Sequence, residues 1–204
     1  MKNVTLVAKV DLNTCTGCKT CEKICPVLAI KIIDRKAIID EDKCRGCSNC
    51  ESRCPVHSIE MVKREEPFVV GIDVEKFDKE KIEEICMNAH MNPEQILCYC
   101  TGVRAEEVAA AILDGARTPE EISSRTGIRT GCTIECIQPL LRIIHAAGIE
   151  LKPIEGGWQW YGITPTSWDL TDEVKEKYAN KGFYFDEDKE LFERVASARK
   201  EKGE

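Results

Sequence analysis

The sequence predicts an α+β protein made of three parts. Residues 1–68 hold a repeated run of closely spaced cysteines, separated by short apolar segments and turns that are typical of small hairpins. Residues 94–150 place apolar residues at helical spacing between capping signals, which predicts a small all-α domain. Residues 69–93 are expected to be a linker and a helix, and residues 151–204 an aromatic-rich C-terminal extension.

The first domain contains the run C-x2-C-x2-C-x3-C-P twice, from Cys15 to Pro26 and from Cys44 to Pro55. Three thiolates spaced in this way on a tight loop can converge on one face of an iron–sulfur cube. Zinc fits less well, because it usually takes four ligands as two separated pairs. Disulfides are disfavoured, because the chain shows no secretory signal and twelve of its thirteen cysteines fall in metal-type spacings.

With these two runs, the domain resembles the dicluster bacterial-type ferredoxins along its whole length. The resemblance implies two low-potential [4Fe-4S] clusters, and it implies that the fourth cysteine of each run crosses to the other cluster. The implied ligands are Cys15, Cys18, Cys21 and Cys54 for cluster I, and Cys44, Cys47, Cys50 and Cys25 for cluster II. A domain of this size is too small to rely on its apolar core alone, so the clusters should be needed for folding.

Three expectations concern the rest of the first half of the chain. Apolar triplets on both sides of a polar turn predict a β-hairpin at residues 31–39. Residues 65–75 are expected to be a linker, followed by an amphipathic helix that begins near Phe77. Cys86 lies on the apolar stripe of that helix and is expected to be a buried thiol, not a ligand.

The helical domain carries a second group of cysteines, a C-x-C pair and later a C-x3-C pair: Cys98, Cys100, Cys132 and Cys136. Between the pairs, Thr118 and Pro119 followed by two glutamates predict a capped helix start, and that helix should end at Gly127. The cysteines therefore lie on loops and helix starts, where free N–H groups and the helix dipole favour an anionic thiolate cluster.

Through CYCTGV, the TPEEI helix start and the closing cysteine pair, residues 95–148 resemble the [2Fe-2S] domain of the bacterioferritin-associated ferredoxin type. Nitrite reductases and amino-acid dehydrogenases contain the same domain. The resemblance implies a third cluster. That family usually closes with C-x2-C, and the wider C-x3-C loop leaves [2Fe-2S] and [4Fe-4S] both open. A zinc site and a redox dithiol are the alternatives.

The C-terminal extension concentrates aromatic residues on an irregular, Gly- and Pro-containing segment: Trp158, Trp160, Tyr161 and Trp168. Such residues are good interface anchors, and we expect them to dock on a partner subunit. The alternative is that they pack on this chain's own domains. Two charged helices are expected to follow, at 171–178 and 186–200.

Composition and motifs narrow the functional class. The net charge of −7 and the lack of a long basic patch disfavour nucleic-acid binding. The sequence contains no run of about 18 apolar residues, so membrane insertion is not expected. The N-terminus lacks a signal sequence, so a cytoplasmic protein is expected. No nucleotide-binding or nucleophile–base motif is visible. So many cluster cysteines suggest an anaerobic setting.

These observations favour an electron-transfer subunit of an anaerobic oxidoreductase complex, in a hetero-oligomer with a metal- or flavin-containing catalytic subunit. The domain combination is similar to accessory subunits of tungsten or molybdenum aldehyde oxidoreductases, of class II benzoyl-CoA reductases and of flavin-based NADH-linked complexes. The alternatives are a free soluble ferredoxin shuttle, which would not need the aromatic extension, and an iron–sulfur regulatory or iron-delivery protein.

Overall fold

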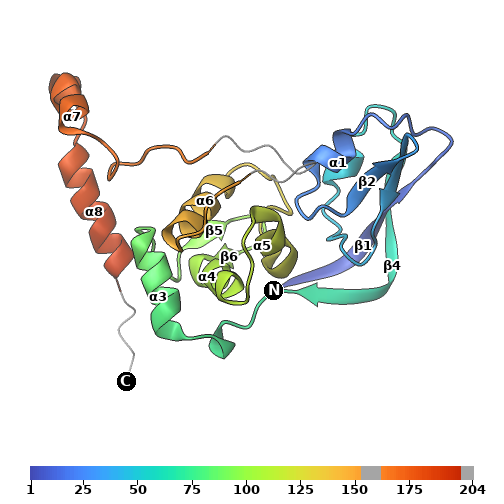
Figure 1. The fold of residues 1–204 in the computed structure, drawn as a ribbon, viewed down its shortest axis with the longest axis horizontal. Helices are drawn as coiled ribbons and strands as arrows, with labels where there is room; N and C mark the ends of the chain where they lie inside the picture. Colours follow the sequence, from blue (N-terminus) through green and yellow to red (C-terminus); the bar gives the residue numbers. More distant parts are fainter. Residues whose placement is uncertain (153–161, 199–204) are drawn as a thin grey trace.

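The computed structural model describes residues 1–152 and 162–198. Within them, helices alternate with two-stranded antiparallel sheets, which confirms the α+β prediction. Figure 1 shows the cysteine-rich domain at one end of the long axis, the helical domain in the middle and the C-terminal helices at the other end. Trp158, Trp160 and Tyr161 lie outside the described residues.

Two short helices and a hairpin form much of the cysteine-rich domain: α1 (Thr20–Ile24), α2 (Asn49–Ser52), β2 (Ile30–Ile33) and β3 (Lys36–Ile39). Each helix begins inside one cysteine run. The strands pair antiparallel, and the turn residues Asp34 and Arg35 both have positive φ, as a type I′ turn requires. The hairpin predicted at residues 31–39 is confirmed.

A long ladder joins this domain to the next one. β1 (Lys2–Val10) runs antiparallel to β4 (Ile59–Val70), with a register shift between Val4 and Leu6. Beyond the shift, the ends of the two strands reach the helical domain, as Figure 1 shows. The prediction of a linker at residues 65–75 is therefore wrong for residues 65–70. This segment is part of β4, because the start of the chain pairs with it as β1.

The helical domain follows the ladder. Its elements are a 3₁₀ turn η1 (Val74–Lys76), α3 (Lys79–Asn88), β5 (Ile96–Cys98), β6 (Val103–Arg104), α4 (Ala105–Leu113), α5 (Pro119–Thr126) and α6 (Ile137–Ala146). The pairing of β5 with β6 is a small departure from the predicted all-α fold. α5 begins and ends as predicted: the Thr118 hydroxyl accepts from the Glu121 N–H at 3.2 Å, and Gly127 ends the helix with a φ of 80°.

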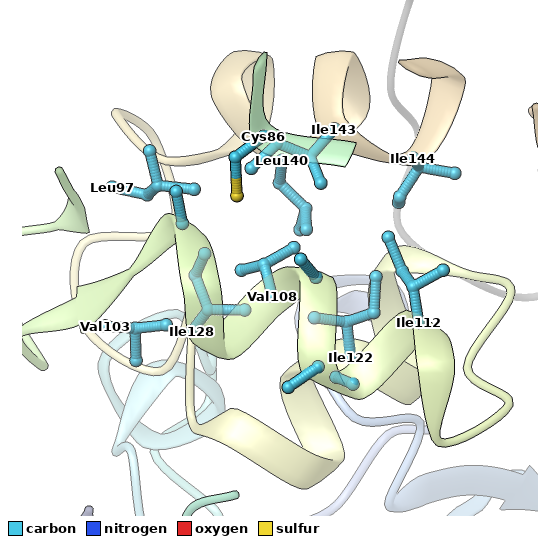
Figure 2. Packing of buried hydrophobic residues seen from close by; sticks show 14 of the residues in the cluster. Cys86, Leu97, Val103, Val108, Ile112, Ile122, Ile128, Leu140, Ile143 and Ile144 are labelled. Carbon is cyan, nitrogen blue, oxygen red and sulfur yellow. The ribbon is translucent and has the colours of Figure 1, made fainter. Parts of the chain in front are cut away.

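The core of the helical domain is largely aliphatic and is built by α3, α4, α5 and α6. Val108, Ile122 and Leu140 are 0% exposed, and Figure 2 shows their side chains meeting between the helices. Cys86 of α3 is also 0% exposed and points into this core, as expected of a buried thiol. Because α3 shares this core, it is part of the helical domain and not of a linker.

The C-terminal extension contains α7 (Asp172–Tyr178), η2 (Ala179–Lys181) and α8 (Phe185–Ser197), close to the predicted helices. Only Ala196 of α8 is buried. The Asn92 side chain holds the end of this helix by donating to the carbonyl oxygens of Ala196 at 3.2 Å and Ala198 at 2.6 Å. In the described residues, no helix has the length and apolar character needed to cross a membrane.

Candidate iron–sulfur sites

The two cysteine runs fold into matching loops. In each loop the N–H of the first cysteine donates to an aspartate carbonyl, from Cys15 to Asp11 at 3.1 Å and from Cys44 to Asp40 at 3.0 Å. The aspartate side chains accept a further backbone N–H each, which closes a tight turn before the first cysteine. The sequence repeat is therefore also a repeat of local structure.

Glycine is required at the same place in both loops. Gly17 has a φ of 69° and Gly46 a φ of 59°. A Cβ on Gly17 would lie 2.4 Å from the carbonyl oxygen of Arg35, and one on Gly46 would lie 2.6 Å from the carbonyl oxygen of Leu6. Neighbouring backbone thus packs directly against each loop and holds the three cysteines that follow in position.

The cysteines of the two runs gather around two separate cavities, and each cavity takes one cysteine from the other run. The first cavity is lined by Cys15, Cys18, Cys21 and Cys54. The second is lined by Cys25, Cys44, Cys47 and Cys50. These are the two groups that the ferredoxin resemblance implies as ligands, so the fold places the crossing cysteines where a cluster would need them.

Backbone N–H groups point at the sulfurs of the two crossing cysteines. The Ala29 N–H donates to Cys25 Sγ at 3.2 Å, and the Ser58 N–H donates to Cys54 Sγ at 3.3 Å. Hydrogen bonds of this kind stabilise negative charge on cluster sulfur and tune the reduction potential. Both cavities therefore offer four thiols together with donors for a negatively charged group.

Burial makes the free thiolates costly in both cavities. Desolvation raises the pKa of Cys21 to about 11 and that of Cys50 to about 12. A thiolate in such a place needs a positive partner, and iron supplies that charge when a cluster is bound. The donor set, the shape of the loops and the burial fit [4Fe-4S] clusters at both places.

The four cysteines of the helical domain also come together. Cys98 ends β5, Cys100 lies in the next turn, Cys132 lies after α5, and Cys136 is the N-cap of α6. A side-chain hydrogen bond with Cys136 lowers the pKa of Cys98 to about 5, and the same contact raises the pKa of Cys136. A backbone hydrogen bond from Glu135 lowers the pKa of Cys132, and a side-chain bond with Cys100 lowers it further.

A buried ion pair supports the loop at this third site. Arg129 Nη1 lies 3.1 Å from Glu120 Oε1, and the two side chains are 1% and 3% exposed. Arg129 has a φ of 67°, and its backbone N–H bonds to the sulfurs of Cys98 and Cys136. This bond contributes to the lowered pKa of Cys98 and opposes the larger effects of the Cys98 contact and burial, which raise the pKa of Cys136. The ion pair therefore helps to hold the residue whose backbone N–H serves both cysteines. In the sequence, Glu120 is part of a helix start signal only, and no local pattern marks Arg129.

Close packing also fixes the other cysteine pair of the third site. A Cβ on Gly131 would lie 2.3 Å from Cys100 Cβ and 2.9 Å from its Sγ, so only glycine lets the Cys132 loop approach the C-x-C turn. All three predicted cysteine groups are thus assembled by the fold, whereas Cys86 stays apart from them.

Comparison with known families agrees with these sites. Residues 14–58 match the family model of a 4Fe-4S dicluster domain, and residues 96–146 match that of a BFD-like [2Fe-2S] binding domain. No curated protein and no solved structure gives a significant match to the chain. The molecule is thus an iron–sulfur protein with two cluster-binding domains. Its cofactors are two [4Fe-4S] clusters and a third, [2Fe-2S] cluster, and domains of these kinds indicate electron transfer.

Of the four predicted interface residues, the structure describes Trp168. Its ring stacks on His90 with the centroids 4.2 Å apart and the planes 8° from parallel, and its Nε1 donates to Glu193 at 3.2 Å. Trp168 therefore joins the end of α3 to α8, which is the intrachain alternative for this residue. Among residues 162–198, the large exposed hydrophobic side chains lie further along the chain: Tyr178, Phe183, Tyr184, Leu191, Phe192 and Val195.

Proposed function

We propose that this chain is the electron-transfer subunit of a larger oxidoreductase complex, and that its three cysteine groups are the ligands of its three clusters. When bound, the clusters supply one-electron transfer. The chain's own residues would hold them with thiolates and direct backbone N–H groups at the sulfurs, and most of the proposed ligand cysteines are buried. The combination of three sites on one chain with a charged C-terminal helix that carries an exposed apolar stripe is the observation that carries the proposal.

The exposed face of α8 supports a protein partner. Leu191, Phe192 and Val195 lie on this helix and are 47%, 48% and 56% exposed, and Phe183 and Tyr184 just before it are 55% and 65% exposed. A stripe of this kind on a charged helix typically marks an interaction site. A catalytic subunit carrying a metal or flavin cofactor fits this role, because the motifs of this chain include none that would act on a substrate.

The surface of the cysteine loops supports a cytoplasmic, anaerobic setting. Cys18, Cys100 and Cys132 are exposed, one beside the first cavity and two at the third site. Thiolate-ligated clusters that solvent can reach are open to oxidation by oxygen. The proposal therefore places the complex in a reducing compartment without oxygen.

The docking role is tested on the protein purified anaerobically from its own cells. Native mass measurement should give a hetero-oligomer, and Phe192→Glu combined with Val195→Glu should release this chain from it. Glu187→Gln, also in α8, is the matched control and should leave the complex intact. A native mass equal to that of the monomer would contradict the proposed subunit role and favour a free shuttle.

The ligand groups are tested by serine variants and iron analysis. The intact protein should bind about 10 iron atoms, as two [4Fe-4S] clusters and one [2Fe-2S] cluster require. Cys54→Ser should alter the signal of one [4Fe-4S] cluster, Cys25→Ser that of the other, and Cys136→Ser that of the [2Fe-2S] cluster in electron paramagnetic resonance spectra. Cys86→Ala is the control and should retain all three signals. Loss of a signal in that variant would contradict the assignment.

A further inference from the structure

Two basic side chains lie where the second cysteine loop meets the helical domain. Lys2, at the start of β1, donates from Nζ to Thr130 Oγ1 at 2.8 Å and to the Thr130 carbonyl at 3.4 Å. Thr130 is buried and lies two positions before Cys132. Lys2 is therefore a half-buried cation that reaches from the ladder to the loop of the third site.

Lys2 also faces the second site. Its ammonium interacts electrostatically with Cys47 and Cys44 of the second cavity and with Cys98 of the third site. The one positive charge is thus shared between two of the three cysteine groups.

Arg45 forms the second connection at the same interface. It follows Cys44 directly, and its guanidinium donates to the Ser124 carbonyl from Nε at 3.1 Å and from Nη2 at 3.0 Å, and to Ser124 Oγ at 2.8 Å. Its remaining donor group, Nη1, bonds the carbonyl oxygens of Asp42 and Lys43. The guanidinium therefore ties the second cysteine loop to α5 of the helical domain.

In residues 1–152 and 162–198, no side-chain hydrogen bond connects the first cysteine loop to the helical domain. The position that corresponds to Arg45 in the first run is Thr16. Arg64, which donates to the Cys44 carbonyl at 3.3 Å, stacks with Arg45 on Phe68, at 4.8 and 5.3 Å from the ring centroid. The positive charge of this region is gathered around the second loop and the interface.

We propose that Lys2 and Arg45 hold the second site next to the third, so that the second site lies between the first and the third. We also propose that the charge of Lys2 raises the reduction potentials of the clusters at the second and third sites. This inference rests on the proposed function. A cation stabilises the additional negative charge of a reduced centre, and the stabilisation is larger where water is excluded. Lys2 and Arg45 are positioning residues, since neither supplies a ligand. The order of the sites along the chain of electron transfer is then first, second and third.

The test is a potentiometric titration of the anaerobically purified full chain, followed by electron paramagnetic resonance. Lys2→Met should lower the potential of the [2Fe-2S] cluster and of one [4Fe-4S] cluster, the one altered by Cys25→Ser. The expected change is about a tenfold lower ratio of reduced to oxidised centres at a given potential, which corresponds to about 59 mV. The cluster altered by Cys54→Ser should keep its potential.

Three further variants separate charge from contact. Lys2→Gln keeps a hydrogen-bond donor for Thr130 without the charge and should behave as Lys2→Met does. Lys2→Arg should keep both potentials near those of the wild type. Lys181→Met removes an exposed charge from the C-terminal extension and should shift none of the three potentials.

Two results would overturn the inference while leaving the proposed function in place. One is a Lys2→Gln protein with wild-type potentials. The other is an equal shift of all three clusters, which would mean that Lys2 acts only through net charge. Wild-type protein that holds no third cluster would instead contradict the proposed function, and the inference with it.

Discussion

The two cluster-binding domains bury very different cores. The core of the cysteine-rich domain combines a few small aliphatic residues with six of the proposed ligand cysteines. These cysteines are Cys15, Cys21, Cys25, Cys44, Cys50 and Cys54. The core of the helical domain consists mostly of Ala, Val, Ile and Leu side chains. Of its four proposed ligand cysteines, Cys98 and Cys136 belong to this core, whereas Cys100 and Cys132 are exposed. One domain is therefore organised around its cofactors, whereas the other has a core that exists without them.

The largest effect should come from removing iron. Chelation under anaerobic conditions should unfold the cysteine-rich domain, because its core thiols lose the group that they surround. The helical domain should keep most of its structure. Hydrogen exchange would show this as loss of protection in β2 and β3 and retained protection in α4 and α6. Equal loss of protection in both domains would contradict the comparison.

Breaking the buried ion pair should be the most damaging single substitution in the helical domain. Arg129→Met leaves the Glu120 carboxylate buried without its partner, and we expect a loss of about 3–5 kcal/mol of unfolding free energy. Denaturant unfolding of the helical transition measures it. Arg125→Met, which removes a partly exposed pair with Asp114, is the matched control and should cost less than about 1 kcal/mol.

Cys86 tests whether a cysteine in the aliphatic core is a structural residue. Burial raises the pKa of its thiol to about 12, so it remains protonated. Cys86→Ser should cost about 1–3 kcal/mol, because it buries a hydroxyl group without a partner. Cys86→Ala should cost less, and iron content should be unchanged in both. A lower iron content in the alanine variant would mean that Cys86 is a ligand.

The smallest effect should come from the cap of α5. Thr118→Ala removes the acceptor of the Glu121 N–H and should lower the unfolding free energy of the helical domain by about 1 kcal/mol. Thr118→Ser keeps the oxygen and should be close to the wild type. Thermal unfolding of the two variants gives the comparison. Because α5 carries Glu120, a change in the [2Fe-2S] signal of Thr118→Ala would show that the cap also positions the third site.

Local signals predicted much of this molecule. The three cysteine groups, the hairpin at 31–39 and the Thr118 cap depend on residues close in sequence, and the structure contains each of them. The ladder between β1 and β4 was missed because its two strands are far apart in the chain, and no short pattern shows that they pair. The expectation of a linker at residues 65–75 is wrong up to residue 70 for that reason.

Local sequence patterns also could not predict the positions of the charged residues around the sites. Arg129 and Glu120 look like ordinary polar residues in the sequence, and only packing shows that both are buried. Lys2 precedes the first cysteine run, and only the structure shows that it donates a hydrogen bond to Thr130 of the helical domain. Motif spacing identifies ligands, whereas the surroundings that tune those ligands depend on tertiary contacts.

The exchange of Cys25 and Cys54 between the two cavities has a consequence for biosynthesis. A ribosome releases the chain from its N-terminus, so Cys15, Cys18 and Cys21 emerge well before the residue that completes their group. In the second group, Cys25 likewise emerges before the loop from Cys44 to Cys50 that carries the other three cysteines. With the proposed ligands, neither [4Fe-4S] cluster can be fully ligated until both runs have left the ribosome, so metal loading of this domain would be a late and joint event.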